Sequence, residues 1–345
     1  MPVVGADELR ECMEAIYEGV GVPPEEARLV ARHQLENSLA GHDSHGALRT
    51  PAYVRLIQEG RIVPGARWEI LNDYPATLLV DGHWGLGFVV TEAAMELALE
   101  KARTVGVAAL SIRRQGHVGR LGAYTAQAAE AGMAALMMAD SGRAPKAVVP
   151  FGGTDARLGT NPISIGLPAD VPGNVVVDFA TSAVAGGKIR FAHGSGNAVP
   201  KGWIVDRDGN PSTDPAAFLN GGTLMPLGGD QGHKGYALSF AVESLAAVLS
   251  GIGFGSDPDG FPNDGILLVL LNIAMFRSLE GFREEMREFV EYVKASPPAP
   301  GVETVLYPGE LEQRRREERL RDGIAVPEKI WSELQSLRRQ FVASP

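Results

Sequence analysis

Apolar residues recur every three or four positions through roughly the first seventy residues, which is the spacing of amphipathic helices. Asp7 is placed to cap the first of these helices. Pro24 and the two glutamates after it are typical of the start of a second helix, which we expect to end near Gly41. A short third helix is expected to follow Pro51 and to close at Gly60. The pattern therefore predicts a helical N-terminal segment.

From about residue 75, short aliphatic runs alternate with amphipathic stretches. The runs expected to be strands are ATLLVDG, VAALSIRR, MAALMMAD, NVVVDFA, GILLVLL and VETVLYPG. The stretches expected to be helices are Gly87–Arg103, Gly119–Ala131, Gly235–Ser250 and Leu279–Lys294. Because continuously apolar strands are covered on both faces, this alternation predicts an α/β core.

After Tyr307-Pro308-Gly309 the pattern returns to helix, in the charged run ELEQRRREERLR. Two opposite-charge pairs stand four residues apart in it, Glu312 with Arg316 and Glu317 with Arg321. We interpret this run as a solvated helix face.

The composition is that of a globular protein with an acidic balance. Of the 345 residues, 45% are hydrophobic, and 32 Lys and Arg stand against 42 Asp and Glu. The net charge of −10 disfavours nucleic acid and anionic membranes as partners. The longest apolar run, Gly265–Phe276, contains Asn272 and is too short to cross a bilayer. With one cysteine, Cys12, and no signal-peptide pattern, the protein is expected to be cytoplasmic and free of internal disulfides.

Glycine-rich turns are frequent, but neither common nucleotide-binding motif is present. The pattern G-x-G-x-x-G fails after Gly85 and Gly87 because the next position required is Val90, and Gly186-Gly187-Lys188 lacks the rest of a P-loop. Other turns offer backbone N–H groups, hydroxyls or a lysine, which are groups that bind phosphate; they are LGTNPISIGLP, DFATSAVAGGK, GGDQGHKGYA and YPGE. Their combination indicates a phosphate-bearing ligand held outside the two standard folds.

The stretch GHDSHGALR, from Gly41 to Arg49, concentrates ionisable side chains between two predicted helices. Each imidazole, carboxylate and guanidinium costs free energy to bury without a partner, so a core has little use for them. The stretch is either a solvated loop or an active site, and a loop on a rigid helical scaffold suits the second. Arg49 could bind a carboxylate with its planar fork or form a salt bridge at a helix end.

Rival hypotheses apply to the same residues. His42, Asp43 and His45 could bind zinc or iron, with His117 or Asp178 completing the shell, in a metal-dependent hydrolase or lyase. No H-E-x-x-H motif or cysteine pair supports that hypothesis, and we expect no metal. A scaffold without enzyme activity would leave the polar clusters unexplained.

The motifs resemble those of the malate/L-lactate dehydrogenase family that is unrelated to the Rossmann-fold enzymes of the same name. The matching segments, which cover nearly the whole chain in order, are GHDSHGALR, RQGHVGRLGAY, VVPFGG, GTNPISIGLP, VVDFATSAVAGGKI, GWIVDRDGNPSTDP, GGDQGHKGYALSFAVESLAAVLSG, YPGE and DGIAVP. The family includes ureidoglycolate dehydrogenase, diketogulonate reductase, sulfolactate dehydrogenase and Δ1-piperideine-2-carboxylate reductase. The resemblance implies hydride transfer between NADH or NADPH and the C2 carbonyl, or cyclic imine, of a small 2-oxo acid, giving a reduced acid such as malate or lactate.

The resemblance also implies a fold and an assembly. The expected fold is a non-Rossmann α/β nucleotide-binding and catalytic domain over residues 71–310, with a large mixed sheet and a small helical subregion. A helical domain from both chain ends, residues 1–70 and 311–345, is expected beside it. The expected partners are the small acid substrate and a second copy of the chain in a homodimer.

The resemblance assigns roles to the site residues. His45 is implied as the proton donor to the C2 heteroatom, Ser44 as part of its relay, and Asp178 as the aspartate near this histidine. An imidazole with a pKa near neutrality suits such a donor. His117 is the competing candidate, because the ureidoglycolate branch uses the histidine of this GHVG segment as proton acceptor; we take it as a residue that orients substrate or cofactor. Arg49 is expected to bind the substrate carboxylate.

For the cofactor, NAD or NADP, the family pattern maps onto Thr160, Asn161, Pro162, Val176, Val177, Asp178, Phe179, Ala180, Thr181, Ser182, His233, Lys234, Gly309, Glu310 and Leu311. The chain departs from the family pattern at two of the motifs. His233 stands where relatives often carry an aromatic residue, and Asp140-Ser141 stands where they often carry an asparagine.

Overall fold

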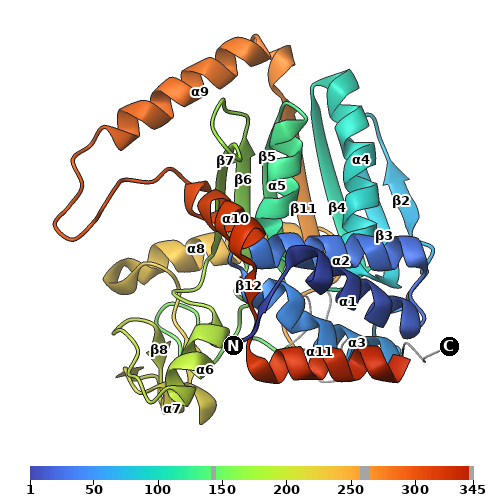
Figure 1. Cartoon of the computed structure of the whole chain (residues 1–345). Coiled ribbons are helices and arrows are strands. Elements are labelled where there is room, and N and C mark those ends of the chain that lie inside the picture. Colours follow the sequence, from blue (N-terminus) through green and yellow to red (C-terminus); the bar gives the residue numbers. More distant parts are fainter. Residues whose placement is uncertain (141–144, 257–264, 342–345) are drawn as a thin grey trace.

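A seven-stranded mixed sheet lies at the centre of the fold (Figure 1). The computed structural model describes residues 1–140, 145–256 and 265–341, so Ser141 lies outside the described residues. Across the sheet the strands are β2 (Glu69–Asp73), β3 (Thr77–Gly85), β4 (Val107–Gln115), β11 (Gly265–Asn272), β5 (Met133–Asp140), β6 (Pro162–Leu167) and β7 (Val175–Ala180). β3 and β4 are parallel, and the other neighbours are antiparallel.

Most of the strands arise from the apolar runs singled out in the sequence. ATLLVDG, VAALSIRR, MAALMMAD, NVVVDFA and GILLVLL contribute β3, β4, β5, β7 and β11. The prediction for VETVLYPG is wrong, because residues 302–309 form no strand. Instead of running beside β7, this segment crosses its start, where the Pro308 carbonyl accepts a hydrogen bond from the Val176 N–H at 3.0 Å. The strand β6 has no apolar run of its own, since its proline and glycine are typical of turns.

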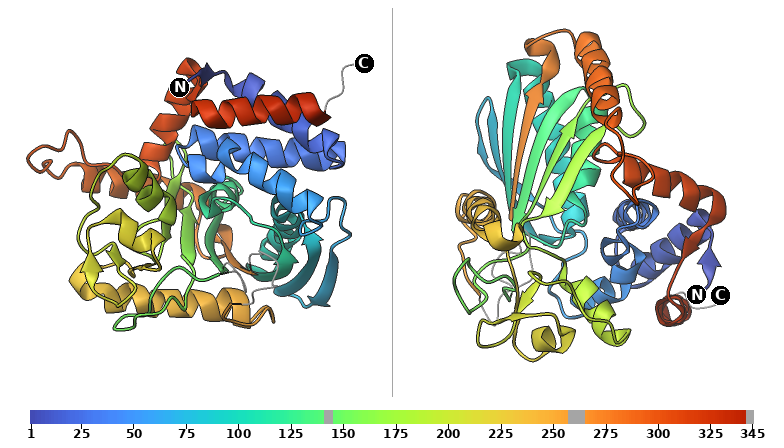
Figure 2. Two further views of the ribbon diagram at one scale, coloured as in Figure 1. Left: turned by 90° about the horizontal axis from the view of Figure 1, so that it is seen from below. Right: turned by 90° about the vertical axis from the view of Figure 1, so that its left-hand side faces the viewer.

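Helices cover both faces of the sheet (Figure 2). They are α4 (Gly87–Val105) and α5 (Leu121–Glu130) on one face, and α8 (Gly232–Val242) with its π-helical continuation (Glu243–Val248) on the other. Alternate residues of β5 point to opposite faces of the sheet. Met137 lies in the large core under α4 and α5, and Met138 packs beneath α8. The double cover explains why the strands are apolar on both sides.

The two ends of the chain pack together against the α4 and α5 side of the molecule (Figures 1 and 2). The helices are α1 (Ala6–Gly19), α2 (Pro24–Leu39), α3 (Thr50–Gln58), α10 (Glu310–Asp322) and α11 (Glu328–Phe341). The short strands β1 (Val3–Val4) and β12 (Ile324–Ala325) pair antiparallel and tie the ends to each other. Asp7 is not the cap of α1: Gly5 precedes the helix, and Asp7 lies within the first turn. The division into two domains remains a prediction.

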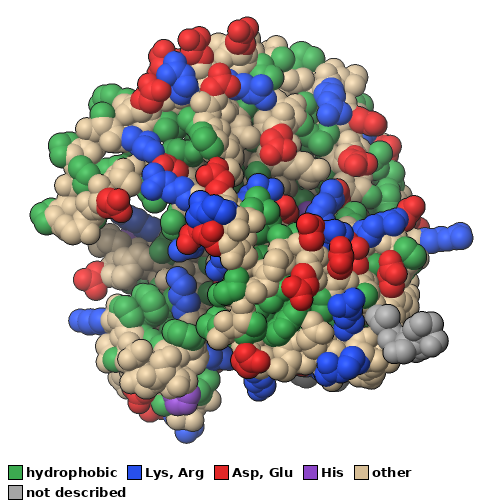
Figure 3. Space-filling view, viewed as in Figure 1, with side chains coloured by type: hydrophobic (Ala, Val, Ile, Leu, Met, Phe, Trp, Pro, Cys, Tyr) green, Lys and Arg blue, Asp and Glu red, His purple; other side chains and the backbone are tan. Residues whose placement is uncertain are grey.

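A smaller lobe and a projecting helix complete the molecule. The lobe contains α6 (Gly186–Gly194), β8 (Ile204–Val205), β9 (Pro211–Ser212), α7 (Pro215–Leu219) and β10 (Thr223–Leu224), and has its own small core. α9 (Leu279–Lys294) projects beyond the sheet in Figure 1. Figure 3 shows charged side chains of both signs lying together over α9 and α10. Short 3-10 turns occur at Gly229–Gln231 and Ile273–Met275.

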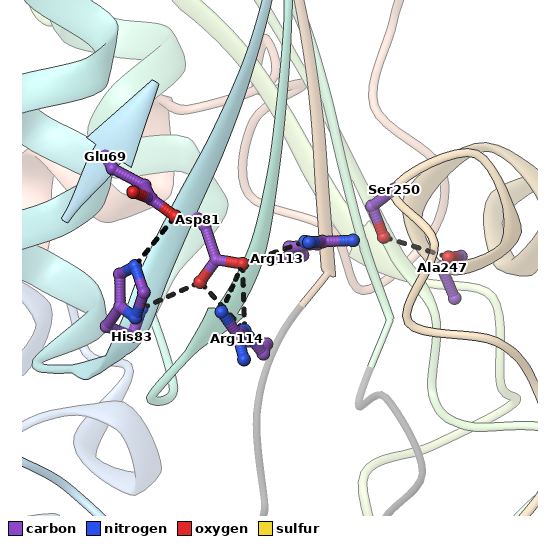
Figure 4. Close-up of polar contacts among 7 residues, drawn as sticks. All are labelled: Glu69, Asp81, His83, Arg113, Arg114, Ala247 and Ser250. Carbon is purple, nitrogen blue, oxygen red and sulfur yellow. Dashed lines mark hydrogen bonds and ion pairs between the residues drawn. The ribbon is translucent and has the colours of Figure 1, made fainter. Parts of the chain in front are cut away.

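The last residues of β3, just before α4, are irregular (Figure 4). His83, Trp84 and nearby Arg114 have positive φ angles of 46°, 65° and 49°, which side chains rarely adopt. The fully buried Asp81 accepts hydrogen bonds from the Arg113 and Arg114 Nε atoms at 2.9 and 2.8 Å, and these hold its pKa below the usual value. This ionic cluster holds the ends of β3 and β4 together.

The end of β3 also positions the segment that leads into α5. The Gly85 carbonyl accepts a hydrogen bond from the Gly116 N–H at 2.8 Å. A Cβ atom at Gly87 would lie 2.1 Å from the Gly116 oxygen and 2.7 Å from the His117 oxygen. Only glycine therefore allows the start of α4 to approach the backbone at His117 so closely.

Candidate functional site

The GHDSHGALR segment follows α2 as two 3-10 turns, Asp43–His45 and Ala47–Arg49. Polar side chains of α2 fix its backbone: the Ser38 hydroxyl accepts from the Ala47 N–H at 3.0 Å, and Asn37 Nδ2 donates to the His45 carbonyl at 3.2 Å. At Gly46 a Cβ atom would lie 2.0 Å from the Ser38 hydroxyl oxygen. The loop is thus pressed onto α2, and its side chains are presented from a rigid support.

The C-terminal helix α10 holds the outer side of this loop. Asp43 forms an ion pair with the Arg319 guanidinium, at 3.1 Å for its Oδ2 atom. His42 Nε2 lies 3.4 Å from a carboxylate oxygen of Glu312, whose pKa this contact lowers. His42 and Asp43 therefore anchor the loop to α10.

The two predicted pairs within α10 are wrong: Glu312 and Arg316 contact the N-terminal segment, and Glu317 and Arg321 have other partners within the helix. The Arg316 guanidinium donates to Glu36 of α2 at 2.8 and 3.3 Å. Arg321 pairs with the adjacent Asp322 at 2.7 Å, and Glu317 accepts from Gln313. Attraction to the loop and to α2 outweighs the i, i+4 pairs, which contribute only a few tenths of a kcal/mol each.

His45 and His117 face each other, with ring centroids 5.3 Å apart. The Nδ1 atom of His117 lies 2.5 Å from the Tyr53 hydroxyl and also accepts the Gly119 N–H at 3.3 Å. A backbone N–H can only donate, so Nδ1 is an acceptor and the ring proton belongs on Nε2. Burial, with repulsion from His45 and Arg49, holds the pKa of His117 well below its usual value.

His45 has a different partner, the exposed hydroxyl of Ser44, which lies 3.0 Å from its Nδ1 atom. A hydroxyl can donate or accept, so this contact serves both the neutral and the charged imidazole. Burial lowers the pKa of His45 to about 4, helped by repulsion from His42, Arg49 and Arg120. The ring is therefore neutral at pH 7.

The positive charges of two arginines, which belong to different elements, lower the pKa of His45. Arg49 lies at the start of α3, with its Cζ atom 5.9 Å from the centre of the Tyr53 ring, and Arg120 directly precedes α5. The Nε atoms of both arginines are buried without a hydrogen-bond partner. Within the part of the chain that the structure describes, neither arginine forms an ion pair with a carboxylate. Arg120 is not among the predicted site residues, although it lies within the segment RQGHVGRLGAY that resembles the family.

Asp178 lies on β7, and its Oδ2 atom accepts the Gly122 N–H in the first turn of α5 at 2.8 Å. Burial raises the pKa of the Asp178 carboxyl, while attraction to Arg120 and the Gly122 hydrogen bond oppose that shift. Among the described residues, no hydrogen bond joins it to His45. Asp178 thus borders the site from the sheet, next to Arg120.

The proposed metal ligands do not converge. His42, Asp43 and His45 contact Glu312, Arg319 and Ser44 respectively. Over residues 1–140, 145–256 and 265–341, no group of three or more His, Cys, Asp or Glu side chains could hold a metal ion. No helix in these ranges is long and apolar enough to cross a membrane.

Most residues expected to bind the cofactor lie on β7, the last strand in the sheet order, or near one of its ends. Thr181 and Asn161 are buried and structural: the Thr181 hydroxyl donates to the Asn161 carbonyl at 2.9 Å, and Asn161 Nδ2 donates to the Ser239 carbonyl at 3.0 Å. His233 and Lys234 are exposed in the first turn of α8. A hydrogen bond from the Leu227 N–H to the Thr181 carbonyl, 2.9 Å long, joins this region to the end of β7.

The remaining cofactor candidates lie along β7 or beside one of its ends. The Gly309 backbone has a φ of +95° and lies so close that an added Cβ would be 3.1 Å from the Val176 nitrogen. The Glu310 carboxylate is saturated by Lys294 at 2.7 Å and by Arg314 at 2.6 Å, while the Leu311 side chain is exposed. The other positions are Thr160 and Pro162, which flank Asn161, and Val177, Phe179, Ala180 and Ser182 along or just beyond the strand.

A cleft of about 570 Å³ opens between α2, α5, α10 and the start of β7. Its lining includes Arg120, Val176, Gly309, Glu312 and Arg316. It therefore brings Arg120 and one end of the cofactor candidates to the same cleft.

A family model described as malate/L-lactate dehydrogenase matches residues 4–335. The chain belongs to the malate/L-lactate dehydrogenase family. It is 36% identical to the L-sulfolactate dehydrogenase of Methanocaldococcus jannaschii over 323 residues, which is 92% of this chain and 91% of that protein. It is 36% identical to the L-lactate dehydrogenase of Cupriavidus necator, with 97% of each covered. The crystal structure of malate dehydrogenase from Entamoeba histolytica matches all of this chain and 99% of its own with a TM-score of 0.94 at 28% identity.

Family membership confirms the resemblance stated from the motifs and the α/β fold expected from it. It indicates a dehydrogenase of 2-hydroxy acids that works with a nicotinamide cofactor. The sheet order and the absence of G-x-G-x-x-G agree in separating this fold from the Rossmann dehydrogenases.

Proposed function

We propose that the protein transfers a hydride between NADH or NADPH and the C2 carbonyl of a small 2-oxo acid, or the equivalent cyclic imine, with His45 carrying the proton. In the reducing direction a hydride adds to C2 and a proton adds to the C2 heteroatom, leaving oxidised cofactor. When bound, the dihydronicotinamide supplies the hydride. The residues of the chain must bind the acid, orient its C2 and deliver the proton.

The hydrogen bonds of the two histidines support His45 in this role. His117 Nδ1 receives the fixed Gly119 N–H, so a second proton there would face a donor at 3.3 Å. His117 is thus held as a neutral ring whose Nε2–H orients the substrate. His45 can change its protonation state, because the Ser44 hydroxyl can reverse its hydrogen bond and lead the proton to solvent. This difference is the observation that carries the proposal.

Arg49 is proposed to bind the carboxylate next to C2. Its guanidinium has a buried Nε without a partner, and a bidentate carboxylate would supply one. Binding would also offset a positive charge that lowers the pKa of His45. The bound substrate thereby favours protonation of His45, because the pKa of His45 rises when the anion enters.

The outer edge of β7 fits a dinucleotide. Phe179 offers a partly exposed aromatic ring, Gly309 permits close backbone approach, and Lys234 places an exposed ammonium group at the start of a helix. These are the groups that stack on a ring and bind phosphates. We propose that the cofactor lies along this edge, with Asp178 facing the site from the middle of the strand.

We further propose that the chain works as a homodimer in the cytoplasm. The outer face of α8 and its π-helical continuation supports the assembly, because Phe240, Val248 and the following Leu249 are 61%, 52% and 59% exposed. Light scattering tests it, and a mass near 36.6 kDa at micromolar concentration would count against a dimer.

The test of the proton carrier is a comparison of His45→Gln with His117→Gln. The first should lower kcat for reduction of a 2-oxo acid by roughly 10²–10⁴-fold, the range of general acid catalysis, with little change in cofactor binding. His117→Gln should be milder, since an amide N–H can still orient the substrate. Loss of turnover in His117→Gln, with His45→Gln within about threefold of wild type, would assign the proton to His117.

A further inference from the structure

Tyr53 contacts two of the groups to which the proposed function gives a role toward the substrate. Arg49 directly precedes α3 and Tyr53 follows it by four residues, so the two side chains lie on the same side of that helix. The Arg49 Cζ atom is 5.9 Å from the centre of the Tyr53 ring. The His117 ring meets the same tyrosine edge-on, with ring centroids 6.1 Å apart. One side chain therefore borders both the proposed carboxylate-binding group and the His117 imidazole.

The Tyr53 hydroxyl has two acceptors at unequal distances, and both belong to His117. The Nδ1 atom is 2.5 Å away and the backbone carbonyl oxygen 3.5 Å away. A hydroxyl has one proton, and the shorter contact is the stronger hydrogen bond. Nδ1 carries no proton of its own, because the Gly119 N–H also donates to it at 3.3 Å. The Tyr53 hydroxyl therefore donates to Nδ1.

Donation to Nδ1 has a consequence at the other nitrogen of the ring. Hydrogen bonds in a chain polarise one another, so the Tyr53 hydroxyl draws electron density from the imidazole and makes Nε2–H a stronger donor. The Gly119 contact fixes the tautomer but is long, so the orientation of the ring depends mainly on Tyr53. When a hydride adds to C2, negative charge grows on the heteroatom there, and a fixed, polarised N–H stabilises that charge.

Packing holds Tyr53 in this place. Its side chain is only 1% exposed, and its ring lies against that of Phe88, with centroids 6.1 Å apart. Phe88 follows Gly87, the residue whose backbone touches the carbonyls of Gly116 and His117. The segment at His117, α3 and α4 thus meet at Tyr53, and the hydroxyl cannot leave Nδ1 without disturbing this contact.

We propose that Tyr53 is a positioning residue of the dehydrogenase: its hydroxyl orients and polarises the His117 ring, and its ring supports the Arg49 guanidinium. This inference rests on the proposed function and adds a residue to the same site. The two tasks belong to different parts of one side chain, so two substitutions separate them.

The kinetic test compares Tyr53→Phe with Tyr53→Leu, using whichever of pyruvate and oxaloacetate the wild type reduces faster. Tyr53→Phe should lower kcat by about 3- to 10-fold, the effect of one neutral hydrogen bond, and leave KM for the acid within about twofold because the ring is kept. Tyr53→Leu should lower kcat at least as much and also raise KM by about threefold or more, since the support of the guanidinium is lost.

Nitrogen NMR of the protein labelled with 15N-histidine observes the ring directly, and the spectrum of His117→Gln assigns the His117 resonances. Wild type should show a protonated Nε2 and an unprotonated, hydrogen-bonded Nδ1. In Tyr53→Phe the Nδ1 resonance should move toward that of a nitrogen without a hydrogen bond. The measurement on wild type does not depend on the folding of any variant.

Tyr17→Phe is the matched control. Tyr17 is likewise fully buried, and its hydroxyl donates to Gln34 at 2.9 Å rather than to a histidine. The variant loses a buried hydroxyl in the same way, so it should change the melting temperature about as much as Tyr53→Phe does. Its kcat should stay within about twofold of wild type, and its His117 resonances should not move.

The outcomes separate this inference from the proposed function. A protonated Nδ1 in wild type overturns the inference, as does a Tyr53→Phe variant with the wild-type Nδ1 resonance. A loss of kcat in Tyr53→Phe no greater than that in Tyr17→Phe, or a wild-type KM in Tyr53→Leu, overturns it too, and all four results leave the dehydrogenase proposal standing. A wild type that binds reduced cofactor but reduces no 2-oxo acid or cyclic imine overturns the proposed function.

Discussion

The protonation of His45 predicts different pH dependences for the two directions of the reaction. With its pKa near 4, only about one His45 ring in a thousand carries a proton at pH 7. Reduction needs the charged ring, so kcat/KM for a 2-oxo acid should fall about tenfold per pH unit, or about 100-fold from pH 6 to pH 8. Oxidation needs the neutral ring, which is fully populated in this range, so kcat/KM for the 2-hydroxy acid should stay level.

The assay is the initial rate of absorbance change of the nicotinamide, at saturating cofactor and constant ionic strength, for both directions. His45→Gln is the control, because it removes the titrating group and should flatten the profile of the reduction. A wild-type kcat/KM for reduction that is constant between pH 6 and pH 8, or that rises with pH, would refute the assignment of the proton to a depressed His45.

Three further predictions, one of them with a matched control variant, concern the packing of the fold and the binding of the cofactor. Lys146→Met should lower the free energy of unfolding in urea by about 3–5 kcal/mol, because the buried Lys146 ammonium lies 3.1 and 2.8 Å from two carboxylates that would lose their counterion; a loss below about 1 kcal/mol would contradict this. Gly87→Ala should lower the melting temperature and the activity together, since its Cβ would lie 2.1 Å from the Gly116 oxygen, whereas Gly187→Ala, which meets no atom within 4 Å, should change neither. Lys234→Ala should weaken binding of the reduced cofactor in a fluorescence titration, and an unchanged Kd would remove Lys234 from the cofactor site.

Those parts of the fold that depend on neighbouring residues could be predicted from the sequence. Pro24 opens α2, and α9 spans the residues that its amphipathic pattern marks, Leu279–Lys294. The runs that form β4 and β11 are apolar because helices cover both their faces. In each case the local preference and the packing agree, so the pattern alone is sufficient.

Features that depend on contacts between distant segments could not be predicted from the sequence. Arg316 and Glu312 look like partners along a helix, but the fold offers each of them a partner from the N-terminal segment. That Arg120 has no ion-pair partner among the described residues likewise follows from where Glu36 and Asp178 find their partners, and no spacing along the chain encodes that. The sequence identified the histidine motifs but left His45 and His117 in competition, since the Gly119 contact exists only in three dimensions.

The ion pair between Asp43, in the loop beside His45, and Arg319 of α10 can form only late in the synthesis of the chain. Asp43 and its anchor Arg319 are separated by most of the chain. At about 5–20 residues per second, a ribosome needs roughly 13–52 s to travel from Arg49 to the start of α10 at Glu310. During that time the loop has been made but lacks the salt bridge that holds its outer side. Until its last helices emerge, a nascent chain therefore holds this loop through α2 but not through Arg319, and a proteolytic cut before α10 would leave the anchor of its outer side on a separate fragment.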